Sequence, residues 1–465
     1  MKRDMATLVE TIGEFISRID FKDLPDDVVE KARLLLLDSI GCALGGSKQR
    51  SILMLEEFVL SSEKKQGRFT IFGSKRKASL LNAVLLNASR ADALEFSDVN
   101  KLVGGHPSCM IVPAALNMAE EHQISGKDLL LAIVLGYEAH RLVVPLYPKA
   151  FRDGIHLVMP GGALGACAAA GRILKLNARE MANALGICGA VVPVAPFEPC
   201  RVGGYVKDLY TGWSAYTGVF SALLAKKGFT GTPTLFEGEL GLYRALGAEK
   251  EAWTCTEGLG SDWVIRKSCI KLHASCRFTH SSADAALKIS QRKEVRPEKI
   301  KKIKITTDTI PYQLNRSFPP KDAIDARFSI PFVVATVLLR KRFIEIEDFD
   351  DAKIHDEDVA RIAKKVEICL DKDLDKMYPE PPLGKGFRTS IMEAELTDGS
   401  RVSERVDYPK GDPNNPASRE EVESKFYTQA QRVLNVRKIR QIIEMIQNIE
   451  EVNDVAALSA RLAAN

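Results

Sequence analysis

The sequence predicts a mainly α protein with an α+β second domain. We expect a large all-helical domain built from the N- and C-terminal segments, with a smaller α+β domain inserted between them. Three observations support this prediction: apolar residues recur with helical spacing through the first half, alternating segments typical of strands follow from residue 300, and a helical pattern returns after a Pro/Asn/Gly-rich linker. The expected boundaries place residues 1–268 and 409–465 in the helical domain and residues 269–408 in the α+β domain.

The helices of the first domain follow from hydrophobic periodicity. After Pro25, apolar residues from Val28 to Ala43 repeat with a period of about 3.6 residues, and Gly45 and Gly46 are expected to end that helix. The same periodicity predicts helices at residues 79–91, 110–121, 126–144 and 207–226. Residues 161–171 (GGALGACAAAG) are almost all small, so we expect their helix at the centre of the bundle, where neighbours can approach closely.

The second domain is predicted from alternation and turn chemistry. Residues 300–307 (IKKIKITT) alternate as a half-exposed strand does, and residues 366–370 and 392–396 indicate further strands. Asp398-Gly399 predicts a hairpin that joins the last of these to residues 401–406. Helices are expected at residues 282–291 and 326–340, and residues 409–418 form the linker back to the helical domain.

Composition limits the classes of function. The chain has 465 residues, 45% of them hydrophobic and 27% charged, which is typical of a globular protein. A net charge of +4 is too small to indicate a nucleic acid or a membrane surface as partner. Nine cysteines without CxxC spacing indicate buried or site thiols in a reducing compartment. The N-terminus does not resemble a signal peptide and the longest apolar run, residues 129–137, is too short to span a bilayer, so we expect a cytoplasmic protein.

Four short segments place proton-transfer or anion-binding side chains among glycines, prolines or small residues. They are residues 104–108 (GGHPS), 153–156 (DGIH), 203–207 (GGYVK) and 271–280 (KLHASCRFTH). Loops that aim an imidazole or an ammonium into a cavity need such residues, whereas helices that only pack do not. No nucleotide-binding motif or clustered metal-ligand spacing is recognisable, so we expect neither a cofactor nor a metal. The pattern indicates acid/base chemistry on a small anionic molecule.

Each candidate in these segments has a structural alternative. His106 precedes Pro107, which disfavours helical backbone, so a site histidine is preferred over one packed inside a helix. His156 opens the small-residue helix, where the positive dipole end favours a neutral imidazole or a bound anion. Lys207 begins a helix after two glycines, although any surface helix carries lysines. Asp98 either orients His106 or caps a helix.

Seven segments, in order along almost the whole chain, resemble the MmgE/PrpD family. They are DSIGCALGG (38–46), HPSCMIVPAALNMAE (106–120), SGKDLLLAIVLGYE (125–138), GIHLVMPGGALGACAAAGRIL (154–174), KGFTGTPTLFEGELG (227–241), CRFTHSSADAAL (276–287) and GDPNNPAS (411–418). The family includes 2-methylcitrate dehydratase, cis-aconitate decarboxylase and iminodisuccinate epimerase. The resemblance implies a helical domain with an inserted lid, a cleft between them, catalysis without metal or organic cofactor, and usually a homodimer. The resemblance also supports Lys207 as a site residue. It implies that His280, which opens a helix, lies at about the position of a site histidine of the family.

The segment at residues 271–280 departs from the family in part. Lys271 suits a carboxylate, as a compact ammonium does. Cys276 stands where decarboxylase-like members carry a histidine, and Arg277 follows it; the thiol is either a proton donor beside cations or a small buried cysteine. His273 is a candidate to replace the imidazole ring that is absent at position 276. Phe332 falls where the decarboxylases carry a catalytic tyrosine, so both differences argue against cis-aconitate decarboxylation.

The sequence therefore predicts a cofactor-independent lyase that acts on a small di- or tricarboxylate, in the manner of 2-methylcitrate dehydratase. One of His106 and His156 removes an α-proton while the other assists the departure of water. Lys207 and Lys271, with Arg277, stabilise the enediolate that forms. Three alternatives stay open: an epimerase or isomerase of a dicarboxylate, a decarboxylase, and a non-catalytic homologue that binds carboxylates.

Overall fold

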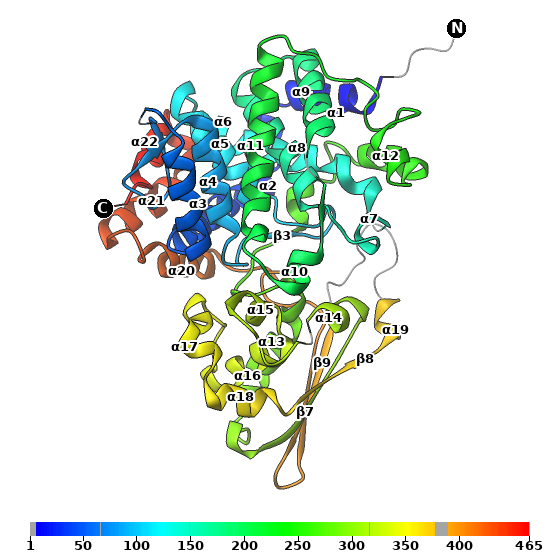
Figure 1. The fold of residues 1–465 in the computed structure, drawn as a ribbon, viewed down its shortest axis with the longest axis vertical. Helices are drawn as coiled ribbons and strands as arrows, with labels where there is room; N and C mark the ends of the chain where they lie inside the picture. The colour runs from blue at the N-terminus through cyan, green and yellow to red at the C-terminus, as the bar shows by residue number, and fades with distance from the viewer. Residues whose placement is uncertain are drawn as a thin grey trace.

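The structure is a computed structural model that describes residues 6–464 apart from residues 66, 148, 193, 316 and 377–388. It is mainly α, as the sequence predicts, and an α+β part extends from one end of a helical body (Figure 1). Within the described residues, the α+β part holds the one sheet of four strands, and the other sheets are two-stranded.

The helical body is formed first by α1 to α12. Its longer helices are α1 (Leu8–Arg18), α2 (Asp26–Gly46), α3 (Arg50–Ser61), α4 (Leu80–Asp92), α5 (Ser108–His122), α6 (Gly126–Ala139), α8 (Val158–Ile173), α9 (Ala178–Val191) and α11 (Val206–Lys226). Its short helices are α7 (Lys149–Arg152), α10 (Glu198–Val202) and α12 (Leu242–Ala245). The periodic segments are thus helices, and α2 ends at Gly46, as expected from the glycine pair at positions 45 and 46.

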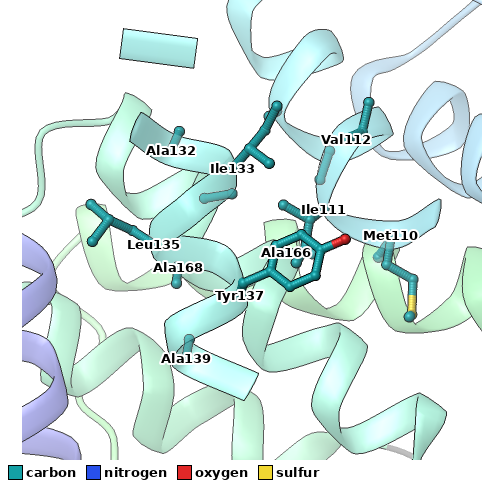
Figure 2. Close-up of a cluster of buried hydrophobic side chains, with 14 of the residues drawn as sticks. Met110, Ile111, Val112, Ala132, Ile133, Leu135, Tyr137, Ala139, Ala166 and Ala168 are labelled. Atoms are coloured by element: carbon teal, nitrogen blue, oxygen red, sulfur yellow. The ribbon is translucent and has the colours of Figure 1, made fainter. Parts of the chain in front are cut away.

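The small-residue helix α8 lies at the centre of this body, as predicted. It packs against α5, α6, α9 and α11, and nearly all of its residues are buried. A Cβ on Gly162 would overlap Met110 of α5, and a Cβ on Gly218 of α11 would overlap the Ala163 carbonyl, so the close approach requires glycine at both positions. Figure 2 shows apolar side chains of α5, α6 and α8 meeting in this core.

One helical stretch, Gly126–Leu146, is long and apolar enough to cross a membrane, which the shorter run seen in the sequence did not suggest. It consists of α6 and a 3₁₀ turn over His140–Leu146. Its apolar window is entirely buried inside the protein. Such burial is typical of the core helix of a globular protein.

The α+β part is built on a four-stranded sheet with the order β10-β9-β7-β8. Strand β7 (Ile300–Thr307) pairs in parallel with β8 (Val366–Leu370) and antiparallel with β9 (Ser390–Leu396), which pairs antiparallel with β10 (Arg401–Val406). The hairpin expected at Asp398-Gly399 is confirmed, with Gly399 at φ 86°. The helices of this part are α13 (His280–Ser290), α14 (Thr309–Leu314), α15 (Ala323–Phe328), α16 (Ile330–Arg340), α17 (Asp351–Ile354), α18 (Glu357–Ala363) and α19 (Lys372–Asp375).

The prediction of a single helix at residues 326–340 is wrong, because the helix is interrupted at Ser329. Ser329 has extended backbone (φ −91°, ψ 108°), and its Oγ accepts a hydrogen bond from the backbone N–H of Phe332. It therefore caps α16, and Pro331 in the first turn fits a helix start. The break separates α15 from α16 and lets α15 face α10 of the helical body (Figure 1).

The C-terminal helices return to the helical body. Helix α20 (Arg419–Ala430) packs along α2, where a Cβ at Gly41 would lie only 3.1 Å from the Phe426 ring. Helices α21 (Val436–Gln447) and α22 (Ala456–Arg461) follow beside α2 and α5, and Figure 1 shows these red segments next to the blue N-terminal ones. The exact boundaries at 268/269 and 408/409 remain predictions from the sequence.

Three two-stranded ribbons complete the fold. Strands β1 (Phe69–Thr70) and β2 (Lys77–Ala78) pair near α4, and β4 (Ile155–His156) pairs with β5 (Ala195–Pro196). Strand β3 (Val99–Asn100) pairs with β6 (Ser268–Cys269), directly before the α+β part begins. The backbone N–H of Ile270 then donates to the Gly411 carbonyl at 3.0 Å. The ribbon β3–β6 thus brings the turn after α4, the start of the lid and the linker after it to one place.

Candidate active site

Three buried carboxylates follow one another at the end of α4. Asp92 is the last residue of the helix, and Glu95 and Asp98 lie in the turn after it, all three at most 5% exposed. Glu95 has a φ of 52°, a left-handed conformation that is costly for a residue with a side chain. The turn is therefore held in a strained shape that keeps acidic groups inside the protein.

Two buried lysines meet these carboxylates. Lys207 Nζ, in the first turn of α11, donates to Asp92 Oδ2 at 2.8 Å and forms an ion pair with Glu95 Oε1. Lys271 Nζ, after β6, donates to the Glu95 carbonyl at 2.7 Å and contacts Glu95 Oε2 at 3.3 Å. Burial lowers the pKa of Lys271 to about 8, and Cys276 partly opposes this. Glu95 thus bridges the two ammonium groups predicted to bind a substrate anion.

His106 is held by one ring nitrogen. Its Nδ1 lies 2.8 Å from the Asp98 carbonyl, which can only accept, so Nδ1 carries the proton in the neutral ring. In the described part of the chain Nε2 has no hydrogen-bond partner. Burial lowers the pKa of His106, and the charge of Asp92, whose Oδ1 is 3.9 Å from Nδ1, acts against that fall.

Asp98 fulfils both of its predicted alternatives. Its backbone carbonyl orients His106, and its carboxylate caps α5 by accepting from the Ser108 N–H at 3.0 Å. The other carboxylate oxygen accepts from the Tyr137 hydroxyl at 2.7 Å. Capping and orientation are therefore two uses of one residue.

His156 has the opposite tautomer from His106. Its Nδ1 accepts from the Val158 N–H at 3.3 Å, so the neutral ring carries its proton on Nε2. The ring stacks on Phe197 (centroids 4.8 Å apart) and meets the edge of Tyr210. Burial, with His106 nearby, lowers the pKa of His156 to about 4. This ring is neutral near pH 7 and offers an N–H.

The cluster of Asp92, Glu95 and His106 has the composition of a metal site. One ligand atom from each lies within 4.8 Å of the others. However, the Lys207 ammonium already binds both carboxylates, so a lysine supplies the positive charge at this place. The donor set fits an internal ion-pair network better than a divalent cation.

The segment at residues 271–280 uses most of its polar atoms within the protein. His280 Nε2 lies 3.1 Å from the Ser275 carbonyl and its Nδ1 lies 3.3 Å from Arg277 Nη1. Arg277 Nη2 pairs with Asp412 of the linker at 3.2 Å, and Lys101 reaches the same carboxylate at 3.1 Å. Both ring nitrogens of His280 are therefore occupied, and Arg277 is tied to the linker.

His273 lies deeper in the α+β part. Its Nε2 pairs with Asp284 Oδ1 at 2.9 Å, and its Nδ1 accepts from the Ile344 N–H at 3.2 Å. Phe332, at 1% exposed, packs against Phe349 in the lid's hydrophobic core. Neither side chain is placed against the carboxylates after α4.

Cys276 belongs to a small apolar cluster between α10 and α15. It lies with Cys200 and Phe328, and Phe197 and Phe278 pack beside them. Burial raises the pKa of the Cys276 thiol, although Lys271 acts against this. The geometry favours the buried-cysteine alternative over a low-pKa proton donor.

The structure thus gathers His106, His156, Lys207, Lys271 and Asp98 near the turn after α4. Arg277, His280 and His273 instead bind partners within residues 271–280, in α13 and in the linker. Asp92 and Glu95 were not predicted as site residues. Their spacing with Asp98 in DALEFSD (92–98) is a signal, since acidic residues at every third position in an apolar context need partners. Asp412, within the segment GDPNNPAS, was not predicted either.

Comparisons with known proteins cover almost the whole chain. A family model described as the MmgE/PrpD N-terminal domain matches residues 10–253, and one described as the MmgE/PrpD C-terminal domain matches residues 273–451. The chain is 26% identical over 457 residues to a cis-aconitate decarboxylase of Aspergillus terreus (strain NIH 2624 / FGSC A1156), covering 92% of this chain and 90% of that protein. It is 25% identical over 449 residues to the cis-aconitate decarboxylase of Homo sapiens (93% and 89% covered). It is 24% identical over 429 residues to an alkylcitrate dehydratase of a fungal species (strain ATCC 74256; 85% and 82% covered).

Proposed function

The chain belongs to the MmgE/PrpD family, whose relatives above are decarboxylases and a dehydratase, and we propose that it is a cofactor-independent dehydratase of a small di- or tricarboxylate. The family supports a lyase acting on a carboxylate in general. The observation that carries the finer proposal is the pair of histidines with opposite tautomers beside two buried lysines.

His106 is the base in this proposal. Its Nδ1–H is fixed on the Asp98 carbonyl, so the lone pair of Nε2 is available to take an α-proton. Asp92 lies close enough to stabilise the imidazolium that results. Among the described residues no carboxylate is hydrogen-bonded to the His156 ring, and the rings of Phe197 and Tyr210 lie against it.

His156 assists the leaving group. Its Nε2–H hydrogen-bonds to the hydroxyl, which departs as hydroxide while the C–H and C–O bonds break and a C=C bond forms; the proton that His106 has taken is then released and converts the hydroxide to water. The low pKa of His156 keeps the ring neutral, which suits a hydrogen-bond donor rather than a competing base.

Lys271 and Lys207 stabilise the enediolate. Lys271 is better suited than Lys207 to bind a substrate carboxylate. One of its hydrogen bonds goes to the backbone carbonyl of Glu95, and a charged substrate oxygen can replace that acceptor. Lys207, fixed by Asp92 and Glu95, adds positive potential. Preorganised groups of this kind commonly contribute about 3 kcal/mol each to the transition state.

The lid residues support this centre without touching the reacting atoms. We assign His280, His273 and Arg277 to positioning the segment that carries Lys271 and Cys276. The contacts of these three side chains with Ser275, Asp284 and Asp412 support that role over direct proton transfer.

Decarboxylation is the second candidate, because several relatives carry that name. Cys276 and Phe332 count against it, since a thiol of raised pKa and a phenyl ring buried in the lid core do not replace a histidine and a tyrosine. An epimerase would use the same base and acid without loss of water, and a non-catalytic homologue would bind carboxylates without exchange.

One NMR experiment separates these functions. Purified, chelator-treated protein in D₂O is incubated with 2-methylcitrate, citrate, cis-aconitate, malate and iminodisuccinate. Dehydration predicts a new vinyl proton signal from citrate or malate, or a new vinylic methyl signal from 2-methylcitrate. Exchange without either signal indicates an epimerase, CO₂ release indicates a decarboxylase, and binding without any change indicates a non-catalytic homologue.

We also propose a homodimer and a cytoplasmic location. The exposed aromatic side chains of α3 and α11 support the dimer: Phe58 is 72% exposed, Trp213 is 45% exposed and stacks on Tyr216. All nine cysteines are free thiols, which suits a reducing compartment. Light scattering measures the mass of the wild type and of Phe58→Glu. We expect a dimeric wild type and a variant of lower mass, and a wild type that is monomeric at micromolar concentration contradicts the dimer.

A further inference from the structure

Asp92 lies between the two groups that carry the proposed chemistry. One carboxylate oxygen, Oδ2, accepts from Lys207 Nζ at 2.8 Å. The other, Oδ1, accepts from Ser97 Oγ at 2.8 Å and lies 3.9 Å from His106 Nδ1. The side chain is 1% exposed, so solvent ions cannot take over its role.

We propose that Asp92 is a positioning residue that serves as a shared counter-ion, for Lys207 before the reaction and for the imidazolium of His106 during it. This inference rests on the proposed function, in which His106 takes the α-proton. In this role the ionised Asp92 carboxylate stabilises the charged His106 ring during proton abstraction, in addition to holding Lys207 in place.

The charges around His106 explain why such a counter-ion is needed. Protonation at Nε2 creates a positive ring near Lys271, which opposes the charge, and burial opposes it further. Asp92 at the end of α4 and Asp98 after it favour the charged ring, while His156 in β4 is itself neutral. Without Asp92, Asp98 would be left to oppose burial and the charge of Lys271.

Asp98 is less able to act as this counter-ion. Its two carboxylate oxygens accept from the Ser108 N–H and the Tyr137 hydroxyl, and it is the backbone carbonyl that meets the ring. Asp92 instead stays ionised: burial raises its pKa, but Lys207 and His106 hold it well below its ordinary value. The carboxylate is therefore a permanent negative charge beside the base.

The test is an NMR titration of the histidine ring protons of the full-length protein with and without Asp92. The His106 resonance is assigned by its disappearance in His106→Asn. Asp92→Asn is expected to lower the pKa of His106 by about 1 and to reduce α-proton exchange by at least about a hundredfold. Glu56→Gln removes another buried carboxylate, the partner of Arg90 in α4, and serves as the matched control that leaves the His106 titration unchanged.

A second variant covers the case in which Asp92→Asn does not fold. Ser97→Ala removes the 2.8 Å hydrogen bond to Asp92 Oδ1 and also the weaker 3.4 Å contact of the Ser97 hydroxyl with His106 Nδ1. It leaves more negative charge facing the ring, so the pKa of His106 should rise. An unchanged or lower pKa in Ser97→Ala, or an unchanged titration in folded Asp92→Asn, overturns the role of Asp92. A wild type that exchanges no α-proton contradicts the proposed function instead, so the two failures are distinguishable.

Discussion

The turn after α4 and the lid segment at residues 271–280 carry similar side chains in two different states. In the first region His106 binds the protein through Nδ1 alone, and in the described residues its Nε2 is left to a ligand. In the second region His280 and His273 each use both ring nitrogens inside the protein. For these two regions we propose that the second hydrogen bond of a buried histidine, rather than its burial, separates a reacting group from a supporting one.

The same contrast separates the cations of the two regions. Lys207 and Lys271 are compensated by carboxylates of the turn after α4, at the place where a substrate anion would arrive. Arg277 is instead compensated by Asp412 of the linker. Four predictions test this division, beginning with the largest effect.

Replacing His106 should have the largest effect. His106→Asn removes the lone pair of Nε2 while a side chain of similar polarity remains, so we expect kcat to fall by about 10³-fold. The measurement is the rate of α-proton exchange or elimination with the active substrate. A folded variant that keeps more than a tenth of wild-type activity would show that His106 is not the base.

Replacing Lys207 should reduce both activity and stability. Lys207→Met leaves Asp92 and Glu95 without their counter-ion, which we expect to lower the free energy of unfolding by about 3–5 kcal/mol and kcat by about a hundredfold. The double variant Lys207→Met/Asp92→Asn should regain part of the stability, because one uncompensated charge is gone, and none of the activity. Denaturant melts and turnover assays measure the two effects, and recovery of activity in the double variant contradicts a catalytic role of Lys207.

The dependence of kcat/KM on pH should reflect the ionisation of Lys271. Its folded-state pKa of about 8 means that the ammonium is present below that pH and lost above it. We therefore expect kcat/KM to fall by about tenfold per pH unit above pH 8, because the carboxylate subsite loses its charge. Lys271→Arg keeps a positive charge at all accessible pH values and should remove this alkaline limb, even if the overall rate is lower. A limb that persists in Lys271→Arg belongs to another group.

The lid histidines should show the smallest effect on chemistry. His280→Gln and His273→Gln each keep one donor and one acceptor, so we expect kcat to fall by less than about tenfold. Any loss should appear mainly in KM, since the segment that carries Lys271 becomes less well placed. A thousandfold loss of kcat in folded His280→Gln, as large as that of His106→Asn, removes the distinction between the two regions.

The sequence predicted the fold well because its signals are local. The strands at residues 300–307, 366–370 and 401–406 have the boundaries read from alternation, and the helix of small residues is central because only small side chains allow that packing. The prediction of one helix at residues 326–340 was wrong, because the apolar pattern continues across Ser329, which caps a second helix. A local hydrogen bond there outweighs hydrophobic periodicity.

The site was predicted only in part, for a different reason. His106, His156 and Lys207 stand out as polar groups beside glycine or proline, which a sequence shows directly. The counter-ions Asp92 and Glu95 lie in an ordinary helix end, and their role depends on Lys207 and Lys271, more than a hundred residues away in the chain. Which ring nitrogen of a histidine is free also depends on distant partners, so the sequence left acid and base undecided.

Solvent deuterium exchange at the α-carbon tests the central claim most directly. Wild-type protein treated with a chelator is incubated in D₂O with the carboxylate panel and compared with His106→Asn and His280→Gln. The account predicts exchange or a vinyl product in the wild type, at least a hundredfold less in His106→Asn, and near wild-type rates in His280→Gln. Equal rates in wild type and His106→Asn, or loss only in His280→Gln, would contradict it.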